Sequence, residues 1–242
     1  MIGTPGSPPA IPMNIIADFA GGGLYAAFSI LAAVVAREKT GRGQQVDIAM
    51  SDGVTSLLAF PASQFFAAGM VPQPGVEMLN GGAPYYAVYE CSDGKWLSIG
   101  CIEPWFWGEL CKALGVEEYV PQQMNREKHP EIFEALRTKF KEKKRDEWFE
   151  ELRQRDICVG PVYALDEVFE DPHVRSRGML TEIEHPEFGA VKQVGVGPKF
   201  SETPGAVRAT APKRGEHTAE LLSEAGYAEA EIEEMRAAGV AG

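Results

Sequence analysis

The sequence predicts an α/β protein in which a smaller α+β unit follows an apolar helical region. An apolar helix is expected at about residues 23–39, and the alternating segment Q-Q-V-D-I-A-M at residues 44–50 is typical of a strand. A linker rich in proline and glycine follows at residues 70–84, and the character of the sequence changes after it. A strand hairpin and amphipathic helices are predicted beyond the linker, so the smaller unit extends from about residue 71 to residue 190.

Before the linker, a loop and two apolar helices are predicted around this strand. Residues 1–13 have five prolines or glycines among the first nine positions and are expected to form an extended loop. The apolar helix that follows is expected to be buried and to end at Thr40-Gly41, with Arg37 and Lys39 complementing its dipole. A second apolar helix at residues 52–68 is expected to bend at Pro61, because proline lacks an amide hydrogen.

After the linker, strands and helices alternate. The turn sequence C-S-D-G joins two predicted strands, residues 85–90 and 95–100, into a hairpin. Amphipathic helices are predicted at residues 104–114, 130–141 and 145–155, strands at 159–163 and 179–184, and two short helices between 216 and 238.

Composition and charge narrow the classes of partner. The chain has 242 residues, 45% of them hydrophobic, and a formal net charge of −12. This length allows one large domain or two small ones. The charge argues against nucleic acid or anionic membrane as the main partner, although a local cleft can still bind a small anion. The longest apolar run, residues 24–35, is twelve residues and too short to cross a bilayer, so no membrane span is expected.

The cysteines and histidines give no signal for a metal or a disulfide framework. The four cysteines, Cys91, Cys101, Cys111 and Cys158, form no C-x-x-C pair, which predicts a reduced, cytoplasmic protein. The four histidines, His129, His173, His185 and His217, lack metal-ligand spacing and are expected at the surface. No serine lies in a G-x-S-x-G turn, so acyl-serine chemistry is not supported. No metal site is therefore predicted.

Asp18 lies in an apolar run and is followed by the glycines at positions 21–23. Asp18 could cap the next helix, since aspartate is favoured at that position. Three glycines weaken a first helical turn by about 1 kcal/mol each relative to alanine, which makes sense where a ligand approaches the backbone closely. In that case Asp18 would act as base or nucleophile beside helix amides that hold an oxyanion. Neither a Walker loop nor a dinucleotide-binding fingerprint fits, and the first two interpretations stay open.

Glu103 repeats the pattern of one acid among large apolar residues. It precedes Pro104 at a predicted junction between a strand and a helix, with Trp105, Phe106 and Trp107 behind it. Its negative charge could simply stabilise the amino end of the helix. Alternatively, desolvation by the indoles would suit the carboxyl group to proton transfer. The residues alone leave both interpretations open.

Several motifs in order carry a family resemblance over essentially the whole chain. D-F-A-G-G-G, followed by A-R-E-K-T-G-R-G-Q-Q-V-D-I-A-M-S-D-G, resembles the family III CoA transferases, which include the α-methylacyl-CoA racemases. L-N-G-G-A-P-Y-Y-A-V-Y-E-C-S-D-G-K and G-C-I-E-P-W-F resemble the racemase branch. D-P-H-V-R-S-R-G-M-L and G-E-H-T-A-E-L-L-S-E-A-G-Y are similar to segments found across the wider family.

The resemblance implies roles for individual residues. Asp18 matches the shared catalytic aspartate, which attacks the acyl-CoA thioester in transferases and is one of two acid/bases flanking the α-carbon in racemases. Glu103 matches the racemase glutamate that pairs with the second base, a histidine. The implied substrate-binding residues are Asn14, Met78, Tyr86 and Ile102, in the acyl pocket, and Gly21 and Gly22, which would let the thioester lie against the aspartate.

The resemblance also implies a domain plan and partners. Residues 1–70 are expected to be the remnant of a large, Rossmann-like CoA-binding domain, residues 71–190 a small α+β domain, and residues 191–242 a segment returning to the large domain. The family's catalytic histidine and most CoA contacts lie upstream of the G-T-P-G-S-P-P loop, so the chain is expected to match the C-terminal part of a family member. Acyl-CoA is the expected substrate, with CoA as part of it and no separate cofactor. An interlocked homodimer or an N-terminal partner segment is expected.

Three functions follow, in order of preference. The first is a racemase of 2-methylacyl-CoA thioesters that removes and returns the α-proton, although this chain alone is expected to racemise poorly without the family's histidine. The second is a CoA transferase that works through an aspartyl anhydride. The third is a non-catalytic chain that binds a partner. The two carboxylates, Asp18 and Glu103, are expected to converge on one cleft, and the helix at residues 24–35 is expected to leave apolar surface uncovered.

Overall fold

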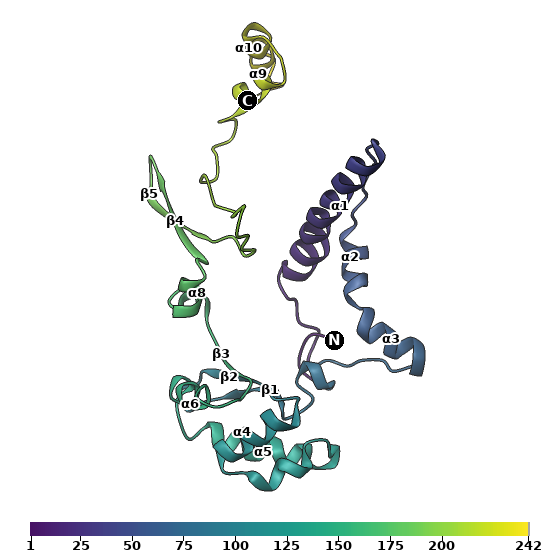
Figure 1. The fold of residues 1–242 in the computed structure, drawn as a ribbon, viewed down its shortest axis with the longest axis vertical. Coiled ribbons are helices and arrows are strands. Elements are labelled where there is room, and N and C mark those ends of the chain that lie inside the picture. The colour runs from purple at the N-terminus through teal and green to yellow at the C-terminus, as the bar shows by residue number, and fades with distance from the viewer. Residues whose placement is uncertain (242) are drawn as a thin grey trace. The chain divides into compact units, whose positions relative to one another are not determined.

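The structure, a computed structural model, describes residues 1–241 and forms two compact units, Met1–Val162 and Tyr163–Gly242 (Figure 1). Helices together with two antiparallel sheets make the chain a mixed α/β protein, as predicted. The predicted linker lies within the first unit. The predicted division into three parts, at residues 70 and 190, stays a prediction.

A π-helix, Ile15–Leu24, continues directly into helix α1, Tyr25–Thr40. Gly41 ends α1 in the left-handed conformation, with φ of 69°, which confirms the predicted helix end. The expectation that this helix is buried is wrong, because none of the residues of α1 is buried. Apolar side chains lie on all sides of α1, so burial would need neighbours all round, and the described residues do not supply them.

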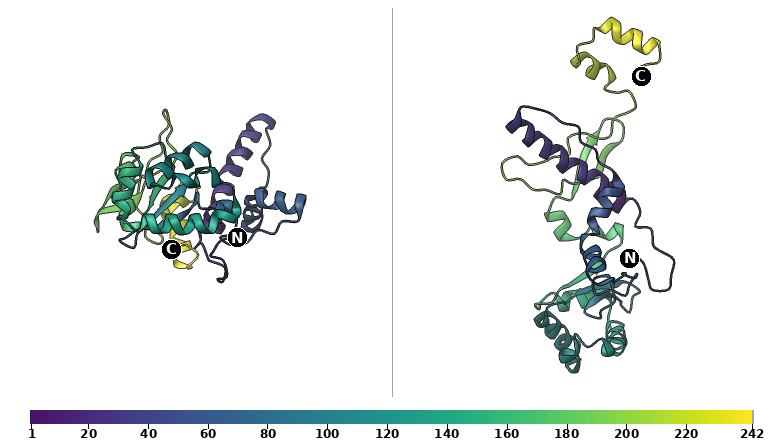
Figure 2. Two further views of the ribbon diagram at one scale, coloured as in Figure 1. Left: turned by 90° about the horizontal axis from the view of Figure 1, so that it is seen from below. Right: turned by 90° about the vertical axis from the view of Figure 1, so that its right-hand side faces the viewer.

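The π-helix and α1 together form one helix, Ile15–Thr40, which Figure 2 shows as a continuous rod. It is 26 residues long, and its mean hydropathy reaches 1.9. By length and composition alone such a helix is able to cross a bilayer, and core helices of globular proteins and signal sequences share these properties. The apolar run was expected to be too short to cross a bilayer. That expectation is corrected, because the helix begins at Ile15, nine residues before Leu24.

The second apolar region forms two helices, α2, Met50–Leu57, and α3, Ala59–Ala68. The break lies at Leu58 rather than at Pro61, because Pro61 cannot donate a hydrogen bond to the carbonyl oxygen four residues earlier. The predicted strand at residues 44–50 is absent from the described structure. Residue Ala49 is extended, but no neighbouring strand hydrogen-bonds to this segment, and a strand needs such a partner.

The main core lies between a three-stranded antiparallel sheet and three helices. The strands are β1, Tyr86–Glu90, β2, Trp96–Gly100, and β3, Val159–Val162, in the order β1-β2-β3. The helices are α4, Pro104–Leu114, α5, His129–Phe140, and α6, Arg145–Leu152. Buried side chains from one sheet face, including Tyr89, Leu97 and Ile99, pack with Trp107 and Leu136 from the helices. Short 3-10 helices, Met78–Asn80, Glu117–Gln122 and Arg126–Lys128, complete this region.

The other face of the sheet has small residues at its centre. Strand pairing places Tyr86 opposite Gly100, and Ser98 between Val88 and Gly160. Because successive side chains of a strand point to opposite faces, these residues share the face away from the core. Glycine and serine in the middle of this face leave space that larger side chains would fill.

The second unit is built from a strand hairpin and short helices. Its elements are α7, Leu165–Val168, α8, Pro172–Ser176, β4, Leu180–His185, β5, Gly189–Val194, α9, Thr218–Glu224, and α10, Glu229–Ala237. The two tail helices are as predicted and pack on each other, whereas β5 was not predicted. Among the described residues of this unit, Ile232 is the one buried side chain. The unit therefore has a very small core.

Candidate active site

Asp18 is exposed in the first turn of the π-helix, inside the helix rather than at its cap. Its backbone amide donates to the carbonyl oxygen of Asn14 at 3.1 Å, and Asn14, also exposed, precedes the helix. Throughout residues 1–241, no hydrogen bond or ion pair involves the Asp18 carboxylate. The carboxylate is thus free to react or to bind, because no polar group of the described chain bonds to it.

The glycines after Asp18 allow two helices to approach closely. A Cβ atom on Gly21 would lie 2.9 Å from Cγ2 of Val54 in α2, and one on Gly53 would lie 2.0 Å from the carbonyl oxygen of Gly21. A Cβ atom on Gly22 would lie 3.1 Å from Cγ of Met50. Packing against α2 is therefore a sufficient reason for glycine at positions 21 and 22. Their predicted contact with substrate stays a prediction.

Glu103 is half-buried at the amino end of α4, in an extended conformation, directly before Pro104. Its carbonyl oxygen accepts a hydrogen bond from the backbone amide of Trp107 at 3.1 Å. Its side chain caps no amide of α4, and within the described part of the chain it forms no hydrogen bond or ion pair. Within the described chain the backbone of Glu103 is therefore anchored, while no polar contact holds its carboxylate.

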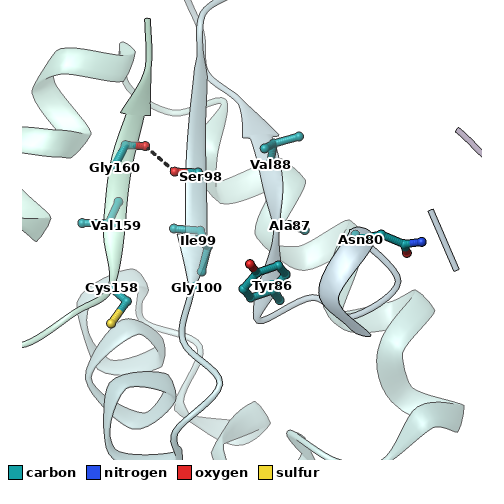
Figure 3. A pocket seen from close by; sticks show the side chains of 11 residues that line it. Asn80, Tyr86, Ala87, Val88, Ser98, Ile99, Gly100, Cys158, Val159 and Gly160 are labelled. Atoms are coloured by element: carbon teal, nitrogen blue, oxygen red, sulfur yellow. Dashed lines mark hydrogen bonds between the residues drawn. The ribbon is translucent and has the colours of Figure 1, made fainter. Parts of the chain in front are cut away.

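A hollow of about 580 Å³ lies on the face of the sheet away from the core (Figure 3). Its lining is Asn80, Gly81, Tyr86, Ala87, Val88, Ser98, Ile99, Gly100, Cys158, Val159 and Gly160. None of these side chains carries a formal charge at neutral pH. The Ser98 hydroxyl donates to the carbonyl oxygen of Gly160 at 2.9 Å, so it is satisfied within the sheet. The hollow therefore suits an apolar, uncharged group.

Glu103 is not part of this lining, but its charge acts on one lining residue, Cys158. Ile102 and Glu103 follow Gly100, the last residue of β2 and part of the lining. Partial desolvation raises the pKa of the Cys158 thiol, and the nearby Glu103 carboxylate raises it further. An acid is thus close to one wall of a neutral hollow. A carboxylate in this region could serve proton transfer if it comes within hydrogen-bond reach of the ligand's proton.

The remaining predicted pocket residues do not all share this hollow. Tyr86 lines it, whereas Met78 lines a second cavity of about 820 Å³ together with Tyr85, Met124 and residues of α5. Ile102 is half-buried against the core. Neither cavity includes Asn14, Asp18 or the glycines after it. The predicted convergence of Asp18 and Glu103 on one cleft stays a prediction.

The histidines and cysteines give no sign of a metal site or of a reactive thiol in the described chain. His129 is half-buried, with Nε2 2.9 Å from the carbonyl oxygen of Gln123, and the other three histidines lie in the second unit. Burial raises the pKa of the Cys101 and Cys111 thiols to about 12 and that of Cys91 to about 11, so these thiols stay protonated at neutral pH. In the described chain, no group of three or more potential ligands could hold a metal ion.

Sequence reasoning missed two residues near Glu103. Cys158 was considered only for pairing, yet it forms one wall of the hollow. Gln123, which is 5% exposed, carried no motif, yet its amide contacts the backbone next to Glu103. A small residue at every second position of a strand, as in Ser98 and Gly100, is the one signal that could have indicated the hollow.

Comparison with known proteins places the chain in a family. Residues 1–218 match the CoA-transferase family III. The chain is 35% identical to human alpha-methylacyl-CoA racemase, over 97% of the chain and 61% of the relative, and 29% identical to the beta subunit of succinyl-CoA–L-malate CoA-transferase from Chloroflexus aurantiacus, over 98% and 60%. The crystal structure of a CAIB/BAIF family protein from Brucella suis superposes with a TM-score of 0.74 at 27% identity, covering 93% of the chain and 59% of the neighbour. The chain spans about three fifths of the length of these relatives, and it belongs to CoA-transferase family III.

Proposed function

We propose that this chain forms part of a racemase that acts on 2-methylacyl-CoA thioesters. The observation that carries the proposal is a neutral hollow of about 580 Å³ lined by Tyr86 and by Cys158, a residue on which the charge of Glu103 acts. An acyl chain would occupy the hollow and bring its α-carbon toward the carboxylate. The identity of 35% to the human racemase, against 29–30% to transferases, agrees with this proposal.

The reaction needs a base on one face of the α-carbon and an acid on the other. The base takes the α-proton, and the electrons of the broken C–H bond move into an enolate whose charge lies largely on the thioester oxygen. The acid then delivers a proton to the opposite face, which inverts the configuration. We assign Asp18 to one side of the carbon, and Glu103 to the other side together with a histidine partner.

Inversion by this chain alone is expected to be slow. Racemases of the family pair the glutamate with a histidine, and neither His129 nor the three histidines of the second unit match it in the sequence. A single carboxylate can remove a proton and return it to the same face. The chain by itself is therefore expected to exchange the α-proton with solvent mainly with retention of configuration.

A CoA transferase is the second candidate. The observation that favours it is the exposed Asp18 carboxylate, which has no partner in the described structure and is free to attack a thioester carbonyl. That attack would form an aspartyl–acyl anhydride and release the CoA thiolate. Glu103 would have no required role in this reaction.

Deuterium incorporation separates the two candidates. The chain is incubated with one enantiomer of a 2-methylacyl-CoA in deuterated water, and deuterium at the α-carbon is measured by mass spectrometry. The assay is run with each enantiomer in turn: Asp18→Asn is expected to lower the exchange rate by about a hundredfold for one enantiomer, and Glu103→Gln for the other. Asp52→Asn and Glu109→Gln, acidic neighbours on α2 and α4, serve as matched controls and should exchange at the unaltered rate.

Trapping with hydroxylamine tests the transferase candidate. A transferase anhydride at Asp18 would be trapped as a hydroxamate that peptide mass spectrometry detects, and this adduct would replace the racemase proposal by the transferase. Rapid inversion by the chain alone would refute the assigned need for a histidine. A chain that neither exchanges protons nor forms the adduct would instead act by binding a partner.

A further inference from the structure

Gln123 is one of two buried polar or charged side chains in the described chain, the other being Arg145. It follows the 3-10 helix Glu117–Gln122 and is 5% exposed. Its Nε2 atom donates to the carbonyl oxygens of Cys101 and Ile102, at 3.1 Å and 2.8 Å. Both carbonyls belong to the short connection between β2 and α4, immediately before Glu103.

This connection has few other restraints. Cys101 is tied to the sheet, since its backbone amide donates to the carbonyl oxygen of Tyr85 at 2.8 Å. Beyond Cys101 the chain leaves the sheet, and Glu103 becomes the first residue anchored in α4. The side-chain amide of Gln123 therefore holds the part of the chain that lies between the sheet and α4. By holding the carbonyl of Ile102, it restricts the ψ angle of that residue and thereby the direction in which the side chain of Glu103 leaves the backbone.

The backbone of Gln123 is itself fixed. Its carbonyl oxygen lies 2.9 Å from Nε2 of His129, which donates when that nitrogen carries the proton. The His129 ring packs edge-on against Tyr85, with ring centroids 5.8 Å apart. The residue that holds the Glu103 backbone is thus tied to α5 and to the sheet, so it transmits the rigidity of the core.

The chemistry of the contact requires glutamine. The Nε2 group carries two hydrogens, and each can point to one of the two carbonyl oxygens. Glutamate would place a carboxylate against both carbonyls, with no hydrogen to donate and a buried charge to desolvate. Methionine has a similar length but no donor. Asparagine keeps the amide but is one methylene shorter, which prevents it from reaching both oxygens.

We propose that Gln123 is a positioning residue that fixes the Cys101–Ile102 backbone and so restricts the position of the Glu103 carboxylate. Its part in the reaction rests on the proposed function, in which Glu103 transfers a proton. A carboxylate displaced by about 1 Å loses much of its catalytic effect, because proton transfer depends steeply on geometry. Gln123 itself does not touch the substrate.

The first measurement needs no ligand and decides whether Gln123 holds this backbone. In the isotopically labelled full chain, NMR is expected to show that the side-chain amide protons of Gln123 exchange with water about tenfold more slowly than those of Gln122. Gln122 is the matched neighbour, whose Oε1 accepts from Nδ2 of Asn125 instead. Gln123→Met should shift the backbone resonances of residues 101–103, whereas Gln122→Met should leave them in place. Fast exchange at Gln123, or unshifted resonances, would overturn the proposal.

The second measurement asks whether the position matters for the reaction. In the deuterium-exchange assay, Gln123→Met is expected to lower turnover by about tenfold or more with little change in KM, and Gln122→Met should have no effect. Wild-type turnover in a folded Gln123→Met variant would refute the positioning role. Absence of exchange in the wild type would count against the proposed function alone, since the NMR result stands without it. If Gln123→Met does not fold, Gln123→Asn provides the same two comparisons.

Discussion

Helices α1 and α4 are both rich in apolar residues, but they differ in how far their side chains are buried. In α4, Trp107, Leu110, Cys111 and Leu114 are buried against the sheet, whereas no residue of α1 is buried. Leu31 and Phe28 of α1 are 65% and 54% exposed, while Leu110 is fully buried. The difference teaches that apolar content alone does not bury a helix, whereas a stripe of apolar residues on one side directs it into a core of its own chain.

The largest effect that would test this comparison is on unfolding. Leu110→Ala should lower the free energy of unfolding by about 2–5 kcal/mol, because it removes buried methyl groups and leaves a cavity. Leu31→Ala, the same substitution in α1, should change it by less than about 0.5 kcal/mol. Urea denaturation of both variants measures the difference. Equal losses would mean that α1 is packed as tightly as α4.

A smaller effect on stability is expected where α2 packs against the π-helix. Gly53→Ala would place a Cβ atom 2.0 Å from the carbonyl oxygen of Gly21, so α2 must move away from the π-helix. We expect the local opening of α2 to become easier by about 1–3 kcal/mol. Amide hydrogen exchange in α2 measures this change, with α4 as the internal reference. Unaltered exchange in α2 would show that the helices do not cross at these glycines.

The uncovered face of α1 also predicts self-association. Phe28→Glu with Leu31→Glu should weaken association of the chain by about tenfold, or about 1.4 kcal/mol, because charges replace exposed apolar groups. Phe188→Glu in the turn of the β4–β5 hairpin, where Phe188 is 70% exposed, is the control for an exposed aromatic residue outside α1. Sedimentation equilibrium gives the association constants. A wild-type chain that stays monomeric at high concentration would contradict this prediction.

The smallest effect is expected at Gly108, inside α4. A Cβ atom at this position would meet no atom within 4 Å, and the residue is helical. Gly108→Ala should therefore stabilise the chain by about 0.5–1 kcal/mol, since alanine loses less conformational freedom on folding. Thermal unfolding of this variant, beside Gly53→Ala, measures the contrast between a glycine that is needed and one that is not. A loss of stability would indicate a contact on the open side of α4.

Local patterns predicted the elements whose signals lie close together in the sequence. Helix α4 has the bounds expected from Pro104 at its start and Gly115 after its end, and the β1–β2 hairpin follows from the C-S-D-G turn. The strand expected at residues 44–50 failed because alternation identifies a possible strand but not its neighbour. Strand β5, Gly189–Val194, was missed because its apolar residues are too few to alternate clearly.

The site was predictable only in part. Asp18 and Glu103 stood out as acids among apolar residues, and the family resemblance gave them roles. The small residues Ser98 and Gly100 were a partial signal for the hollow, but its other half depends on the pairing of Gly160 with Ser98, which the sequence does not show. The contact of Gln123 with Ile102 spans 21 residues without any repeating pattern. Such contacts arise from tertiary packing and have no local signature.

The three-stranded sheet can be completed only after strand β3 has been synthesised. The carbonyl oxygen of its Gly160 accepts a hydrogen bond from the hydroxyl of Ser98, which is synthesised 62 positions earlier. At the usual rate of translation, roughly 3 to 12 seconds separate the two residues. Until β3 arrives, one edge of β2 offers unpaired amides and carbonyls to any other nascent chain. The same late segment therefore completes one wall of the hollow and covers the exposed edge of β2.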